Sequence, residues 1–87
     1  MGSNKYAVLS TEGANLVKSS SGVLDSIVVG TTSAQAVRVY DSAGSGGTQI
    51  AELKASIAEN SYDFDVRFAK GLYIENPGGG KLTICYR

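Results

Sequence analysis

Hydrophobic and polar residues alternate one by one over several short segments of this chain. The alternation is clearest in residues 62–68 and 81–87, and it recurs in residues 37–40 and 72–75. Successive side chains of an extended strand point to opposite faces, so alternation gathers the apolar residues on one side of a sheet. The pattern predicts antiparallel strands with one face buried and the other in contact with solvent.

Glycine- and serine-rich stretches separate these segments, and we interpret them as turns. The lengths between the turns, about five to nine residues, suit strands better than helices. Residues 23–29 form the most continuous apolar run. This run predicts a central strand that is covered on both faces, or a strand that lies in an oligomer contact. Residues 6–10 and 14–18 are further strand candidates, and the alternative for the terminal strand is a swap onto a neighbouring chain.

Residues 49–59 fit both a helix and a strand. Ile50, Leu53 and Ile57 have the spacing of one helical face, and the segment is rich in good helix formers. However, neither a capping box nor a C-terminal glycine frames a helix there. The glycine-rich loop that follows residues 37–40 also indicates a hairpin. We therefore predict a strand over residues 48–53.

About seven to eight short strands with regularly spaced turns predict an all-β fold, an antiparallel β-sandwich or jelly roll. The 87 residues correspond to one domain, in which we expect residues 1–5 to form a flexible N-terminal segment. Domains of this size bury a limited core and often rely on a disulfide, a metal or a partner subunit. With one Cys and no His, neither an internal disulfide nor a Cys/His zinc site is possible. Core packing and self-association are the supports that remain.

The charge balance argues against two classes of partner. The 8 Lys and Arg residues cancel the 8 Asp and Glu residues, so the chain has no net attraction for nucleic acid or an anionic membrane. No apolar stretch approaches the ~18 residues of a membrane-spanning helix, and the first residues lack the apolar core of a signal peptide. A lone thiol without such a signal indicates folding in a reducing cytoplasm.

The residues with which most enzymes work are missing or scattered. No His is present to accept a proton from a Ser, and activation of Ser20 by Lys18 would require a desolvated Lys, whereas this one lies in a polar turn. Residues 76–83 lack the Gly and Ser/Thr positions of a phosphate-binding loop and lead into a predicted strand. Cys85 has no activating neighbour in the sequence. We expect no catalytic activity and no cofactor.

Asp63 and Asp65 are the one acidic pair with a plausible alternative role, because two carboxylates on the same strand face can share a metal. Arg67 continues that face. The pattern therefore favours a solvated face or a salt bridge between subunits over a metal site.

The aromatic residues divide between two predicted faces. Tyr62, Phe64, Phe68 and Tyr86 are expected in the core, whereas Tyr40 and Tyr73 fall on the opposite face of their strands. If these two tyrosines cluster, they would mark an interface, since Tyr provides apolar area together with a hydrogen bond. The candidate interface residues are Val28, Tyr40, Asp63, Arg67 and Tyr73.

Three stretches together carry a family resemblance: residues 21–29, residues 37–41 with the glycine-rich loop after them, and residues 62–72 with the final strand ending at Arg87. They resemble small β-rich proteins encoded among the structural genes of tailed bacteriophages and prophages, of the head-decoration or virion-accessory kind. The resemblance implies a non-enzymatic virion protein, often a trimer, that binds capsid or other virion proteins. Such a protein is made in the host bacterial cytoplasm and resides in the virion. The resemblance supplies no catalytic residues.

A carbohydrate- or ligand-binding module, such as a receptor-binding tip, is the alternative function. The loops at residues 42–48 and 77–81 are polar and rich in glycine, and loops of sandwiches often carry binding sites. The absence of Trp counts against a sugar-binding platform.

Overall fold

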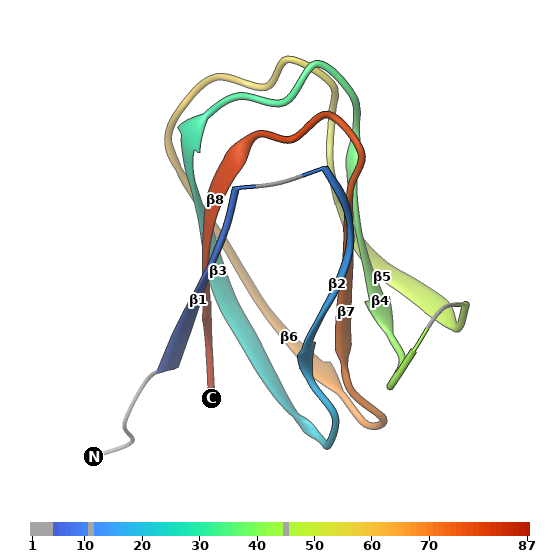
Figure 1. Ribbon diagram of the computed structural model, residues 1–87. Coiled ribbons are helices and arrows are strands. Elements are labelled where there is room, and N and C mark those ends of the chain that lie inside the picture. Colours follow the sequence, from blue (N-terminus) through green and yellow to red (C-terminus); the bar gives the residue numbers. More distant parts are fainter. Residues whose placement is uncertain (1–4, 11, 45) are drawn as a thin grey trace.

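The computed structural model describes residues 5–10, 12–44 and 46–87, and within them the chain forms eight β-strands (Figure 1). The all-β prediction is therefore confirmed. The strands are β1 (Lys5–Leu9), β2 (Gly13–Lys18), β3 (Gly22–Thr31), β4 (Val37–Asp41), β5 (Thr48–Leu53), β6 (Ser61–Phe68), β7 (Leu72–Asn76) and β8 (Lys81–Tyr86).

The strands form two packed four-stranded antiparallel sheets, whose orders are β1-β8-β3-β6 for the first sheet and β2-β7-β4-β5 for the second (Figure 1). Strand β1 pairs with β8, β2 with β7, β3 with β6 and β4 with β5. These pairs describe one long hairpin with its tip between β4 and β5. Rolling this hairpin brings β8 beside β3 and β7 beside β4. The result is the jelly-roll form of a β-sandwich.

The core lies between the sheets and is built from the alternating residues that the sequence places on one face. Leu82 and Ile84 of β8 are buried, and so are Leu72 and Ile74 of β7. Phe68 is also buried, while Tyr62, Phe64 and Tyr86 are partly buried and pack against the core, as predicted. The buried apolar residues are Leu9, Leu24, Ile27, Val29, Val37, Val39, Leu53, Phe68, Leu72, Ile74, Leu82 and Ile84.

Strand β3 corrects part of the sequence interpretation. It is central, between β8 and β6, but the described residues do not bury its outer face as they bury its inner face, since Val28 points outward and is 37% exposed. Leu24 and Ile27 are three residues apart, yet both are fully buried. The pairing register shifts between Leu24 and Ser26, and this β-bulge returns Ile27 to the inner face. The apolar run therefore reflects a bulged strand rather than one buried on both faces.

The ambiguous segment forms a strand where the sequence predicted one. Residues 48–53 are β5, paired with β4, and Ile57 packs against the core from the loop after it. Residues 6–10 correspond to β1, which lies one residue earlier, and residues 14–18 correspond to β2, which begins one residue earlier. Of the expected flexible segment, residues 1–4 lie outside the described residues, whereas Lys5 already belongs to β1.

The loop between β7 and β8 packs closely against residues 31–35. A Cβ atom on Gly80 would lie 2.7 Å from the carbonyl oxygen of Thr31 and 2.9 Å from the amide nitrogen of Ser33. Buried Asn76 donates from its Nδ2 atom to the carbonyl oxygen of Gly80 at 2.8 Å, which holds the loop closed. The glycine at position 80 is therefore required for close approach of two backbone segments.

Candidate functional site

The five candidate interface residues lie on the two outer faces of the sandwich rather than on one. In the first sheet, Val28 pairs with Thr83 and Ser61, Asp63 with Ser26, and Arg67 with Val23. In the second sheet, Tyr40 pairs with Tyr73. Paired residues of an antiparallel ladder share a face. The two outer faces point away from each other, so one flat contact cannot use all five residues.

Tyr40 and Tyr73 lie together on the outer face of the second sheet. They are directly opposite each other on β4 and β7, and their ring centroids are 6.4 Å apart with the planes tilted by 58°. Leu16 of β2 pairs with Tyr73 on the same side and is 47% exposed. We call Leu16, Tyr40 and Tyr73 the tyrosine face. It is a row of side chains across three strands, in which Leu16 is exposed and the two tyrosines are partly exposed.

A row of charged residues runs beside the tyrosine face. Arg38 is paired with Glu75 on β7 and with Glu52 on β5, and its Nε atom lies 3.8 Å from Glu52 Oε1. Tyr40 donates its hydroxyl hydrogen to Glu75 Oε1 at 3.2 Å. The surface thus places a polar row beside an apolar row.

The environment of Tyr40 keeps its hydroxyl protonated. Desolvation raises the pKa of Tyr40 above its ordinary value of 10.0, and the hydrogen bond to the Glu75 carboxylate raises that pKa further. A hydroxyl in this state donates a hydrogen bond at neutral pH but does not act as a base. The hydrogen bond therefore fixes the Tyr40 hydroxyl as a donor to Glu75.

Two shallow hollows flank opposite ends of the strands. One, of about 360 Å³, adjoins the charged row and includes Pro77 of the β7–β8 loop. The other, of about 390 Å³, includes Arg67. The first is lined by Gly13, Ala14, Gln35, Arg38, Glu75 and Pro77, and the second by Ser21, Gly22, Val23, Asp41, Arg67, Phe68 and Ala69. The loop at 42–48, of which residue 45 lies outside the described residues, lines neither hollow.

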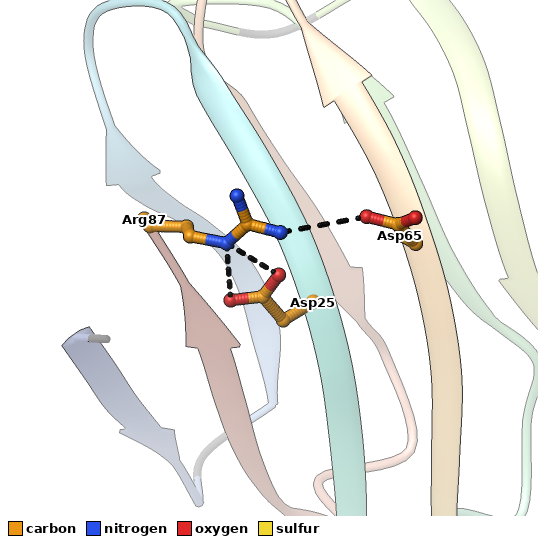
Figure 2. Close-up of polar contacts among 3 residues, drawn as sticks. All are labelled: Asp25, Asp65 and Arg87. Carbon is orange, nitrogen blue, oxygen red and sulfur yellow. Dashed lines mark hydrogen bonds and ion pairs between the residues drawn. The ribbon is translucent and has the colours of Figure 1, made fainter. Parts of the chain in front are cut away.

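The two members of the acidic pair on β6, Asp63 and Asp65, differ in their surroundings. Asp65 lies near Arg87, a partner that the sequence did not suggest (Figure 2). Arg87 places its Nε atom 2.9 Å and 3.2 Å from the two carboxylate oxygens of Asp25. Its Nη2 atom lies 3.6 Å from Asp65 Oδ1. Asp65 adopts φ 54° opposite the β3 bulge. Asp63 takes no part in this cluster, and the described residues contain no group of three or more Cys, Asp or Glu side chains placed to hold a metal.

Asp41 is a further polar residue that sequence reasoning missed. Its carboxylate accepts hydrogen bonds from the backbone amides of Ala69 at 3.0 Å, Lys70 at 2.7 Å and Gly71 at 3.4 Å. These amides belong to the β6–β7 turn. The only available sequence signal was an Asp at a strand end, because its partners lie 28 to 30 residues away in the chain.

In comparisons with known proteins, no family model matches the chain, and no significant match is found among curated proteins or solved structures. Among the described residues, no helix is long and apolar enough to cross a membrane.

Proposed function

We propose that this chain is a non-enzymatic structural protein of a phage particle, a capsid-decoration or accessory assembly subunit that self-associates and binds other virion proteins. The observation that carries the proposal is the tyrosine face. Tyr40 and Tyr73, both partly exposed, form a cluster on the outer face of the second sheet. Tyrosines of this kind supply large, rigid contact area and are enriched at the energetic centres of protein interfaces.

The surroundings of the tyrosine face support a protein partner. Leu16 extends the apolar row, and Arg38 lies between two carboxylates, which gives a polar border with hydrogen-bonding groups of both kinds. Such a border excludes water from the centre of a contact and selects its orientation. Jelly rolls form viral capsid subunits as well as lectins. The fold is therefore compatible with the proposal but does not discriminate between these functions.

The virion assignment is tested on particles from the bacterium or phage that carries the gene. We expect the chain to co-sediment with heads and to be detected on their surface by immunogold electron microscopy. The double variant Leu16→Ser/Tyr73→Ser should remain in the supernatant, whereas the matched variant Val28→Ser, on the opposite outer face, should co-sediment like the wild type. Particles that contain no copies of the wild-type chain would refute the virion assignment.

The self-association is tested separately by light scattering on a sizing column over a concentration series. The resemblance implies three copies, and the proposal requires a mass above the 9.0 kDa of one chain. A monomer at every concentration removes this part of the proposal.

A carbohydrate- or ligand-binding module is the second candidate function. It is favoured by the hollow of about 360 Å³ beside the tyrosine face, in which Gln35, Arg38 and Glu75 offer both donors and acceptors. A glycan array and titrations at millimolar concentrations test it. Binding that is lost in Arg38→Ala and kept in Arg67→Ala would support this function, and no binding to any glycan would exclude the carbohydrate version.

A further inference from the structure

The four edges of the sandwich differ in how well they are protected against pairing with another strand. The edge strands are β1 and β6 in the first sheet and β2 and β5 in the second. An edge exposes unpaired backbone groups, and natural proteins protect edges with bulges and charges. In β2 the register shifts between Leu16 and Lys18, and in β6 the shift lies opposite Leu24 and Ser26. In β5 the register shift lies opposite Val39 and Tyr40 of β4.

Strand β1 lacks this protection within the described residues. All five of its residues pair with β8 in one unbroken register, from Lys5 opposite Tyr86 to Leu9 opposite Leu82. Lys5 is its only charged residue. By contrast, β6 presents Asp63, Asp65 and Arg67 on exposed positions of its edge.

The same strand carries the two most exposed large hydrophobic residues among those described. Tyr6 is 70% exposed and Val8 is 62% exposed. They lie two residues apart on the outer face of the first sheet, opposite Cys85 and Thr83 of β8. A regular, nearly uncharged edge with apolar side chains beside it is a template for strand addition. Figure 1 shows β1 (dark blue) at the margin of its sheet.

We propose that β1 pairs with β1 of a second copy of this chain, antiparallel and about a twofold axis at Ala7, so that the two first sheets form one continuous eight-stranded sheet. The register centred on Ala7 uses all five residues of β1. It places Tyr6 of each copy directly opposite Val8 of the other on the outer face, and aromatic and β-branched side chains are a favourable cross-strand pair. Lys5 falls opposite Leu9, so no like charges meet across the axis.

A second copy suits this edge because the strand is complementary to itself, as an isologous contact requires. The net charge of zero adds no long-range repulsion between copies. This inference rests on the self-association in the proposed function. It makes that association twofold, and thus gives an even number of copies in place of the three that the resemblance implies.

Charge variants on the outer face of β1 test the contact by light scattering over a concentration series. We expect the wild type to have twice the 9.0 kDa of one chain. In Tyr6→Glu/Val8→Glu, like charges face each other at both pairs, and the dimer should weaken by about tenfold or more. Tyr6→Lys/Val8→Lys should weaken it similarly, and an equal mixture of the two variants should restore dimers, because every Glu then faces a Lys. Ser61→Glu, at an exposed position on β6 at the opposite edge of the same sheet, is the matched control and should leave the mass unchanged.

The outcomes separate this inference from the proposed function. A wild-type dimer or trimer that the Glu variant leaves intact overturns the β1 contact but keeps self-association. A wild-type trimer alone also overturns the twofold arrangement. A wild-type monomer at every concentration overturns both the contact and the self-association.

A cross-linking experiment keeps the inference testable if the charge variants fold poorly. It uses Tyr6→Cys and Val8→Cys, each in a Cys85→Ser background, because Cys85 is the neighbour of Tyr6 within the chain. Directly opposed residues of antiparallel strands have Cα atoms about 4.5–5.5 Å apart, which is within the range of a disulfide. The mixed variants should form a disulfide-linked dimer on oxidation, while each variant alone should link far less. Equal linking by Thr48→Cys, on the β5 edge, would contradict the specific contact.

Discussion

At the scale of single residues, Asp41 is the clearest case of a polar side chain that fixes backbone geometry. Hydrogen bonds from the amides of Ala69 and Lys70 hold the pKa of the Asp41 carboxyl below its ordinary value of 3.8. Because the ionised form is the one that these amides stabilise, the carboxylate favours the folded state. It therefore anchors the β6–β7 turn to the end of β4.

The lowered pKa predicts a particular pH dependence. A carboxyl group with a lower pKa in the folded state contributes stability above its unfolded pKa and loses that contribution as the pH falls through the folded pKa. We expect Asp41→Asn to be less stable than the wild type at neutral pH, and the difference to shrink once the pH falls below about 4. Thermal unfolding of both proteins across this range measures the effect. Parallel curves for the two proteins would show that the charge of Asp41 has no such role.

At the scale of elements, the bulge in β3 decides which of its apolar residues are buried in the core. Ile27 is fully buried between the sheets, whereas its neighbour Val28 is exposed on the outer face. We expect Ile27→Ala to lower the free energy of unfolding by about 2–5 kcal/mol, since it leaves a cavity in the core. Val28→Ala should change it by no more than about 0.5 kcal/mol. Urea unfolding of the two variants provides the comparison, and similar losses would contradict the bulged register.

The β7–β8 loop gives a second prediction for an element. In Gly80→Ala, the new methyl group would meet backbone atoms of Thr31 and Ser33, which cannot move aside as a flexible side chain would. We expect a loss of about 1–3 kcal/mol in the free energy of unfolding. Gly44→Ala is the matched control because a Cβ atom there has no neighbour within 4 Å. Equal stability of the two variants would mean that the loops are not packed as described.

At the scale of the whole molecule, the jelly roll joins the two ends of the chain. Lys5 pairs with Tyr86, and Arg87 exchanges backbone hydrogen bonds with Val23 at 2.8 Å and 2.9 Å. Contacts of this sequence separation must close large loops before they contribute stability. Much of the strand pairing therefore joins residues that are far apart in the sequence, and it can form only when most of the chain has folded.

This topology predicts slow folding for so small a domain. We expect refolding from urea to take from about milliseconds to seconds, the range of β-proteins with mostly non-local pairing. Stopped-flow fluorescence of the tyrosines measures the rate. Refolding within microseconds would be inconsistent with the pairing of β1 and β8.

Much of the fold follows from local pattern. Alternation at residues 72–75 and 81–87, and glycine-rich turns between the segments, predict β7 and β8, because a side chain's face in a strand depends on the parity of its position. The same reasoning predicted that Tyr40 and Tyr73 share the face opposite the core. Parity along the chain could not predict that the two tyrosines pair directly, because β4 and β7 become neighbours only after the hairpin rolls up.

The sequence by itself determined that this protein is all-β and contains no histidine, because the first depends on parity along the chain and the second on composition. Only the tertiary structure decided that Val28, Asp63 and Arg67 lie on a different outer face from Tyr40 and Tyr73. It also decided that Arg87 contacts Asp25, that Asp41 holds the turn after β6, and that β1 is the unbroken edge. Each of these results depends on strand order and register, which are set by the packing of the two sheets against each other.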